Sequence, residues 1–277
     1  MKPFYIHLLG TGSAIPSAQR AATCHVLNYD SHYMMIDCGE GTQMQLKRNK
    51  ISPMRIERLF ISHLHGDHYF GLIGLLNTLH LLGKTQTIHI HGPAELYDII
   101  YLQLKAAGTE LRFPLQFHPL HAGSKQLIYK GEQLCCYSFP VTHRIPTWGF
   151  LFEETPPDIL TSRPDKVHEN RGVINKLRSY AFCTDTAFRP ELANYFRGVN
   201  LLYHEATFMH HLAKTAEDTF HSTSVQAAEM AKLAGAKQLI LGHFSSRYTD
   251  LRPLLAEART VFPATEAGID GTMFEIV

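Results

Sequence analysis

Cysteines are few in this chain and do not follow the spacing of a disulfide or zinc-binding framework. The 277 residues include five cysteines, an odd number, and no pair has CxxC spacing. Secreted domains stabilised by disulfides, and zinc knuckles, depend on paired cysteines at short intervals. The cysteine pattern therefore argues against both classes and predicts a protein of the reducing cytoplasm.

Long apolar runs and charged tracts are also missing. No uninterrupted apolar stretch is long enough to span a bilayer, and the first run contains His7 and stops at Gly10, which predicts a strand and turn instead of a signal peptide. The formal net charge is only +1, so any attraction for nucleic acid must come from local features. One such feature, with Lys47 and Arg48, is either a solvated helix end or a patch that contacts phosphate.

Short β-type runs recur along the chain, with helical segments between several of them. Apolar spacing and capping residues predict helices over residues 71–83, 222–236 and 250–263. Strands are predicted at 4–10, 24–29, 33–39, 58–63, 87–92, 134–143, 148–154, 180–185, 200–207, 237–244 and 273–277. This order indicates an α/β fold, an αββα four-layer sandwich of two mixed β-sheets flanked by helices. We expect residues 1–277 to form a single domain, with an irregular excursion at about 153–179.

The segment HLHGDH, at residues 63–68, closes an apolar run and concentrates donor side chains. In an extended strand His63 and His65 point to the same side, because side-chain direction alternates. The glycine that follows allows a sharp turn, so Asp67 and His68 at the start of the next helix can converge on them. Four nitrogen and oxygen donors within one turn predict a metal site.

Three further donors each close another apolar run: His143, Asp185 and His243. A catalytic zinc ordinarily takes three protein ligands plus water, so the donors are too many for one ion and suit two ions that share a carboxylate. We assign His63, His65 and His143 to the first metal, Asp67, His68 and His243 to the second, and Asp185 as the bridge. Two such metals can lower the pKa of a shared water from ~15.7 towards ~7, which favours hydrolysis of phosphate esters.

At these residues the sequence resembles the ribonuclease Z family of the metallo-β-lactamase superfamily, whose members mature the 3′ end of transfer RNA. The resemblance covers nearly the whole chain and depends on the segments LGTGSAIP, DCGEGTQMQL, SHLHGDHYFGLIGLL, HEATF and HSTSVQAAEMAKLAGAKQLILGHFSSRY. It implies a zinc-dependent endoribonuclease that removes the 3′ trailer from precursor tRNA by metal-hydroxide attack on a phosphodiester. The products would be a 3′-hydroxyl on the tRNA and a 5′-phosphate on the trailer.

The resemblance also implies cofactors, partners and further residue roles. It implies two Zn²⁺ per subunit, although this nitrogen and oxygen set also suits Mn²⁺ or Fe²⁺, and a cytoplasmic homodimer that acts on precursor tRNA and not on DNA or a membrane. Asp67 would accept a proton from, or orient, the bridging hydroxide. His221 would lie near the scissile phosphate and donate a proton to the leaving oxygen, and Glu205 would orient His221 or form a structural salt bridge. Asp37 would support the metal-binding loop.

Two departures from the family pattern concern RNA binding. The family's PxKxRN loop falls at residues 16–21, where PSAQRA keeps Pro16 and Arg20, and we expect Arg20, Lys47 and Arg48 to contact substrate. The family's long tRNA-gripping arm falls between His143 and Asp185, where this chain is short. That interval contains the cations Arg163, Lys166, Arg171, Lys176 and Arg178. Two alternatives therefore stay open: a dinuclear hydrolase of small phosphodiesters or sulfate esters, and a non-catalytic, metal-stabilised RNA-binding protein.

Overall fold

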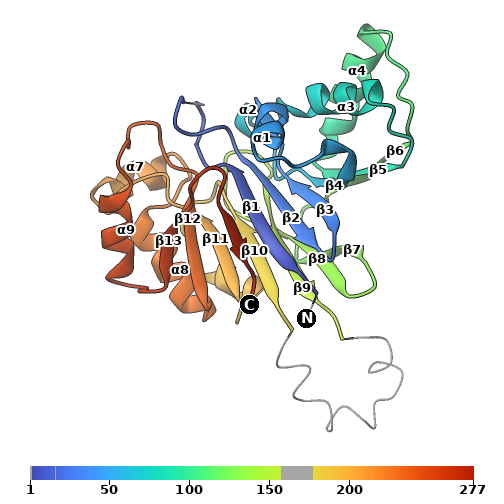
Figure 1. Cartoon of the computed structure of the whole chain (residues 1–277). Coiled ribbons are helices and arrows are strands. Elements are labelled where there is room, and N and C mark those ends of the chain that lie inside the picture. The colour runs from blue at the N-terminus through green and yellow to red at the C-terminus, as the bar shows by residue number, and fades with distance from the viewer. Residues whose placement is uncertain (1, 16, 157–176) are drawn as a thin grey trace, which may run out of the picture.

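A computed structural model describes residues 2–15, 17–156 and 177–277, and these residues form two β-sheets packed face to face (Figure 1). The first sheet has the strand order β14-β1-β2-β3-β4-β5-β6. Its strands are β1 (Phe4–Gly10), β2 (Cys24–Tyr29), β3 (His32–Ile36), β4 (Ile56–Phe60), β5 (Ile88–Gly92), β6 (Leu115–Pro119) and β14 (Met273–Glu275). The pairs β14-β1-β2-β3 are antiparallel and β3-β4-β5-β6 are parallel, so the sheet is mixed.

The second sheet is also mixed and has the order β13-β12-β11-β10-β9-β8-β7. Its strands are β7 (Gln126–Lys130), β8 (Leu134–Pro140), β9 (Trp148–Glu154), β10 (Ser179–Cys183), β11 (Leu201–Glu205), β12 (Gln238–Gly242) and β13 (Thr265–Ala267). The strands from β10 to β13 are parallel, whereas β9 runs antiparallel to both β10 and β8. Consequently β8, β10, β11 and β12 all point the same way, and their carboxyl ends lie along one edge.

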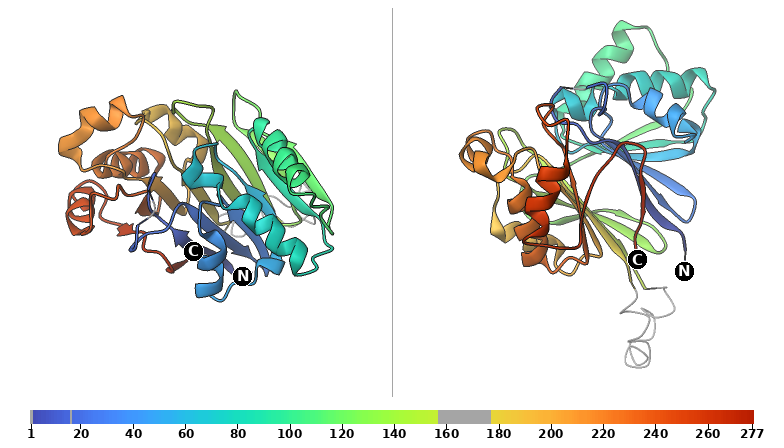
Figure 2. Two further views of the ribbon diagram at one scale, coloured as in Figure 1. Left: turned by 90° about the horizontal axis from the view of Figure 1, so that it is seen from above. Right: turned by 60° about the vertical axis from the view of Figure 1, so that its left-hand side comes forward.

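Helices cover the outer face of each sheet, as the two views of Figure 2 show. Beside the first sheet lie α1 (Thr42–Arg48), η1 (Pro53–Arg55), α2 (Gly66–Tyr69), α3 (Leu72–Leu81) and α4 (Glu95–Ala106). Beside the second lie η3 (Pro190–Phe196), η4 (His210–Leu212), α7 (Ala213–Asp218), α8 (Ser224–Ala234) and α9 (Arg252–Arg259). The predicted αββα sandwich of two mixed sheets is confirmed. None of the helices in the described residues is long and apolar enough to cross a membrane.

Three apolar cores hold these layers together. The core between the sheets is rich in aromatic rings, such as Phe60, Phe150 and Tyr203. One outer core packs the leucines of α3 against the first sheet, and the other packs the alanines of α8 against the second. Because both faces of each sheet are covered, the strands carry nearly continuous apolar runs. The loops at the strand ends are therefore held by a rigid frame.

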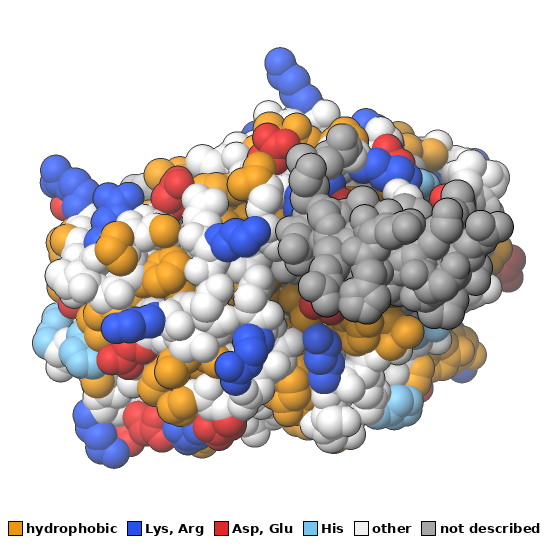
Figure 3. All heavy atoms as spheres, turned by 90° about the horizontal axis from the view of Figure 1, so that it is seen from below, with side chains coloured by type: hydrophobic (Ala, Val, Ile, Leu, Met, Phe, Trp, Pro, Cys, Tyr) orange, Lys and Arg blue, Asp and Glu red, His pale blue; other side chains and the backbone are white. Residues whose placement is uncertain are grey.

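The predicted excursion begins at the end of β9 and returns at the start of β10, and residues 157–176 lie outside the described residues. Arg163, Lys166, Arg171 and Lys176 of the predicted cation group fall there. Figure 3 shows the face that carries this segment: outside the grey atoms, Lys and Arg side chains are mostly spread singly among apolar and uncharged ones. The visible part of this face therefore offers an RNA backbone little concentrated positive charge.

Candidate active site

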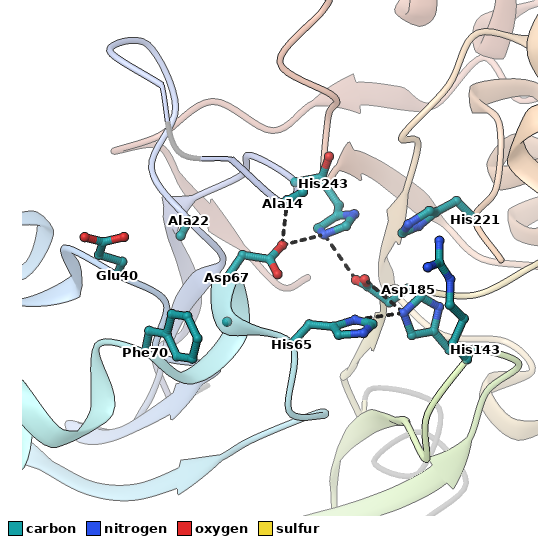
Figure 4. A pocket seen from close by; sticks show the side chains of 13 residues that line it. Ala14, Ala22, Glu40, His65, Asp67, Phe70, His143, Asp185, His221 and His243 are labelled. Atoms are coloured by element: carbon teal, nitrogen blue, oxygen red, sulfur yellow. Dashed lines mark hydrogen bonds and ion pairs between the residues drawn. The ribbon is translucent and has the colours of Figure 1, made fainter. Parts of the chain in front are cut away.

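The carboxyl ends of strands from both sheets meet at a cavity of about 460 Å³, and five of the seven predicted donors line it. These five are His65, Asp67, His143, Asp185 and His243, and His221 lines the cavity with them (Figure 4). The HLHGDH turn follows β4, whereas the other donors follow β8, β10 and β12 of the second sheet. The packing of the two sheets thus brings together donors that are far apart in the sequence.

One group of donor atoms consists of His63, His65, His143 and Asp185. His65 Nδ1 lies 3.1 Å from His63 Nε2 and 3.1 Å from His143 Nε2. The Asp185 Oδ2 atom lies 3.6 Å from His63 Nε2 and 3.8 Å from His143 Nε2. These four ligand atoms all lie within 4.8 Å of one another, close enough to bind a single ion.

The second group consists of Asp67, His68 and His243, with the other oxygen of Asp185. Asp67 Oδ2 lies 3.4 Å from both His68 Nε2 and His243 Nε2. Asp185 Oδ1 lies 3.3 Å from His68 Nε2 and 3.2 Å from His243 Nε2. The two oxygens of one carboxylate therefore face different donor groups, as a bridging ligand must.

These donor sets fit divalent transition metals. Bonds of about 2.0–2.1 Å in a tetrahedral arrangement place neighbouring ligand atoms roughly 3.3–3.4 Å apart, close to the separations found here. His68 Nε2 is fully buried and has no hydrogen-bond partner within the described residues, although it faces both donor carboxylates. A bound cation would satisfy this nitrogen and offset the buried negative charge.

The imidazole nitrogens that face away from the donor groups are held by fixed partners. His63 Nδ1 contacts Ser62 Oγ, His143 Nδ1 contacts a backbone carbonyl, and His243 Nδ1 contacts the Thr207 hydroxyl, at 3.0, 3.2 and 3.1 Å. Such contacts orient a metal-binding imidazole and select its tautomer. Burial also lowers the pKa of His63, which favours the neutral ring that a metal ligand requires.

Asp37 lies behind the donor groups and contacts the loop that carries them. Its carboxylate accepts hydrogen bonds from the Ser62 backbone N–H and side-chain hydroxyl and lies 2.7 Å from His68 Nδ1. Burial opposes protonation of His68, but Asp185, Asp67 and Asp37 together raise the pKa of its imidazole. Asp37 is fully buried and does not line the cavity.

Backbone strain is concentrated at these loops. Asp37, Asp185 and His243 have φ values of 56°, 49° and 53°, in the left-handed region that side-chain-bearing residues rarely occupy. Each such residue costs on the order of 1–3 kcal/mol and persists only where surrounding contacts enforce it. The strain turns the chain sharply just after a strand, so that Asp185 and His243 reach the cavity and Asp37 reaches the His68 ring behind it.

The Asp67 carboxylate also accepts a backbone hydrogen bond that the sequence did not predict. Its Oδ2 atom accepts a hydrogen bond of 2.7 Å from the Ala14 backbone N–H, in the loop after β1 (Figure 4). Burial would raise the pKa of Asp67, but His68 and His243 around the carboxylate lower it, so the group is ionised. The first loop of the chain thereby closes one side of the cavity.

His221 and Glu205 form a pair at the opposite side. The two Glu205 oxygens lie 3.1 and 3.2 Å from His221 Nδ1, and Glu205 also accepts hydrogen bonds from the backbone N–H of Thr186 and of Ser222. Burial would lower the pKa of His221, but the Glu205 carboxylate outweighs it and raises the pKa to about 9. His221 lines the cavity while Glu205 is fully buried behind it.

The predicted substrate contacts lie elsewhere. The Arg20 guanidinium is largely buried and donates to the carbonyl oxygens of Ser245 and Tyr248, so it braces a loop and is not presented to solvent. Lys47 and Arg48 are exposed in the last turn of α1 and do not line this cavity. Pro16 of the expected PxKxRN loop lies outside the described residues.

Three charged or aromatic residues line the cavity although no sequence motif assigned them a role. These are Glu40, Phe70 and Arg144. Glu40 lies within the quoted DCGEG segment, Phe70 follows HLHGDH by two positions, and Arg144 follows His143. Their closeness to the donor motifs was the available signal, but exposure towards a cavity cannot be read from sequence.

Comparison with known proteins agrees with this geometry. The sequence pattern of the beta-lactamase superfamily domain matches residues 32–244. Ribonuclease Z of Bacteroides thetaiotaomicron is 40% identical over 96% of this chain and 93% of its own length, and that of Phocaeicola vulgatus is 42% identical over 96% and 95%. The chain belongs to the ribonuclease Z family.

A solved structure of the same family has the same architecture. The short form of human tRNase Z is 31% identical and superposes with a TM-score of 0.81 over 99% of both chains. The ribonuclease Z fold therefore extends over essentially the whole chain, and the family resemblance found in the sequence motifs is confirmed. Both sheets that supply donors to the cavity are part of this shared fold.

Proposed function

We propose that this protein is a metal-dependent endoribonuclease that removes the 3′ trailer from precursor tRNA. The observation that carries the proposal is the convergence of seven metal-type donors and the Glu205–His221 pair on one open cavity, in a chain of the ribonuclease Z family. An open cavity beside the donors is what distinguishes a catalytic metal centre from a structural one.

The proposed ligands form two sets joined by Asp185. The first is His63, His65 and His143; the second is Asp67, His68 and His243. We propose two Zn²⁺ per subunit, with Mn²⁺ or Fe²⁺ as substitutes that the same donors accept. A pair of such cations supplies a water nucleophile at neutral pH and neutralises charge on a phosphoryl oxygen.

The chain's own residues then set the direction of cleavage. Asp67, fixed by the Ala14 N–H, orients the attacking water through a carboxylate that the neighbouring His68 and His243 keep ionised against the effect of burial. Water attacks phosphorus and the bond to the tRNA 3′ oxygen breaks, so the phosphate stays on the 5′ end of the trailer. His221 donates a proton to the departing 3′ oxygen, and Glu205 keeps its ring in place.

Precursor tRNA is the proposed partner because the curated relatives carry the name ribonuclease Z and the solved neighbour the name tRNase Z. We further propose that the chain folds as one domain, assembles as a homodimer and works in the cytoplasm. The free cysteines Cys24, Cys38, Cys135, Cys136 and Cys183 are all buried and suit a reducing compartment. Contacts with backbone phosphates would supply affinity, and the shape of the RNA would determine which RNA is selected.

Mapping of RNA product ends at single-nucleotide resolution tests the proposal. The metal-loaded protein should cut a precursor tRNA once and leave a 3′-hydroxyl on the tRNA and a 5′-phosphate on the trailer. A second reaction with bis(p-nitrophenyl) phosphate separates the rival hydrolase function: turnover of this ester without cleavage of precursor tRNA would overturn the assignment.

A further inference from the structure

Phe70 is an exposed aromatic ring at the mouth of the active-site cavity. Its relative exposure is 65%, although it lies two residues after the donor His68 at the end of α2. The other aromatic side chains among the cavity-lining residues are histidines. An exposed aromatic ring beside a polar cavity offers a flat apolar surface that a ligand can cover.

The ring is held in a defined position by the backbone beneath it. A Cβ atom added to Gly66 would come within 2.3 Å of the Phe70 ring, so the ring packs over the glycine. The ring also meets Tyr69 edge-on, with centroids 5.0 Å apart and planes at 65°. One surface of the ring is therefore supported by the α2 turn while most of its area stays exposed to the cavity.

The two sides of the cavity differ in charge. In Figure 4, Phe70 and Glu40 lie on one side of Asp67, whereas His143 and His221 lie on the other. Arg144 also lines the cavity, next in sequence to His143. The Glu40 carboxylate repels a phosphate, whereas the Arg144 guanidinium at the other side attracts it. A bound nucleotide would therefore place its phosphate towards Arg144 and its uncharged base towards Phe70.

We propose that Phe70 is a stacking platform for the base of a nucleotide adjacent to the scissile phosphate. The inference rests on the proposed function and adds to it a nucleobase subsite formed by Phe70, supported on Gly66. Flat apolar rings bind unpaired RNA bases by stacking, with little dependence on base identity. The subsite would hold the single-stranded 3′ region in line with the metal donors, because Phe70 and His68 share one turn of helix.

Abasic substrates test the subsite directly. Wild-type protein, F70A and F70W are compared on a precursor tRNA and on two versions with one abasic ribose, placed 5′ or 3′ to the cleavage point. F70A should lower kcat/KM on the complete precursor about 5- to 150-fold, the range expected for one base stacked on an aromatic ring. On one of the abasic RNAs wild type and F70A should agree within about twofold, because the partner of the ring is absent.

Two further variants control for structure. F70W should stay close to wild type because it keeps an aromatic face, and Y101A, which removes a ring 56% exposed on α4 away from the cavity, should behave as wild type on every RNA. An F70A defect of equal size on all three RNAs, or no defect on any, overturns the subsite. Failure of wild type to cleave any of the three RNAs is instead a failure of the proposed function.

Discussion

At the scale of single residues, His221 is the side chain whose role can be isolated most cleanly. Glu205 occupies Nδ1, so Nε2 is the nitrogen free to meet a substrate oxygen. We expect H221A to lower kcat on precursor tRNA about 10²- to 10⁴-fold, the usual contribution of a positioned general acid. Rapid-quench assays with metal analysis of the same sample measure this effect.

The matched control is H211A, which removes an exposed histidine that does not line the cavity. H211A should cleave at the wild-type rate, and H221A should retain the wild-type metal content because His221 belongs to neither proposed ligand set. Loss of metal in H221A would show that the histidine is a ligand and would contradict its assigned role.

We expect Asp37 to affect the affinity for metal and not the chemical step of cleavage. Its carboxylate holds His68 Nδ1 at 2.7 Å and also anchors the Ser62 backbone. D37N keeps the side-chain shape but removes the charge, so we expect metal affinity to fall about 10- to 100-fold, as for other residues that support a ligand. Competition with a chromogenic chelator gives the affinity, and an unchanged binding constant would refute the supporting role.

Some individual side chains could be placed from the sequence, and others could not. Chemical type and position predicted His143, Asp185 and His243 as donors because each closes an apolar run, and the structure places all three beside the HLHGDH turn. The same reasoning placed Arg20 at the substrate, yet its guanidinium is turned inward to two carbonyl oxygens. The direction of the Arg20 side chain depends on a loop more than two hundred residues away in the sequence, so no local sequence pattern could predict it.

At the scale of elements, α8 begins directly behind the active site. Thr223 forms a capping box: its hydroxyl accepts from the Gln226 N–H, and the Gln226 side chain accepts from the Thr223 N–H. T223A should therefore lower the free energy of unfolding by about 1 kcal/mol. Urea titration measures the loss, and T223S, which keeps the hydroxyl, should recover most of it.

The same variant separates helix stability from catalysis. Glu205 holds both the Ser222 N–H and His221 independently of the cap, so T223A should cleave precursor tRNA at nearly the wild-type rate. An activity loss as large as that of H221A would mean that the cap, and not Glu205, positions the histidine.

Elements with continuous apolar runs were predictable, whereas two of the edge strands were not. The predicted helix over 71–83 is α3, and the predicted strand over 148–154 is β9. In contrast, β6 and β7 lie at the edges of their sheets and contain no fully buried residue, so they lack an apolar run. The helix α4 was also missed: its N-cap residue is Ala94, which forms no side-chain capping hydrogen bond, so its start has no clear signal in the sequence.

At the scale of the whole molecule, one ion pair joins segments from both halves of the fold. Arg178 is 4% exposed and binds both oxygens of Glu154, across the strands β9 and β10. Its guanidinium also donates to the Lys2 and Ile276 carbonyl oxygens, near the two ends of the chain. Arg178 is one of the five cations between His143 and Asp185, where the family has its tRNA-gripping arm, but these contacts give it a structural role.

Breaking this pair should destabilise the entire sandwich and do so in a pH-dependent way. R178M leaves the Glu154 carboxylate without its partner, which we expect to cost about 3–5 kcal/mol in the free energy of unfolding at neutral pH. Burial favours protonated Glu154, but the hydrogen bonds from Arg178 outweigh burial and lower its pKa below the ordinary value of 4.5. The stabilisation is therefore complete above that value and disappears as the pH falls through the lowered folded-state pKa. Urea titrations of wild type and R178M should accordingly converge in acid, and a difference that stays constant with pH would show that Arg178 acts through packing instead of through its charge.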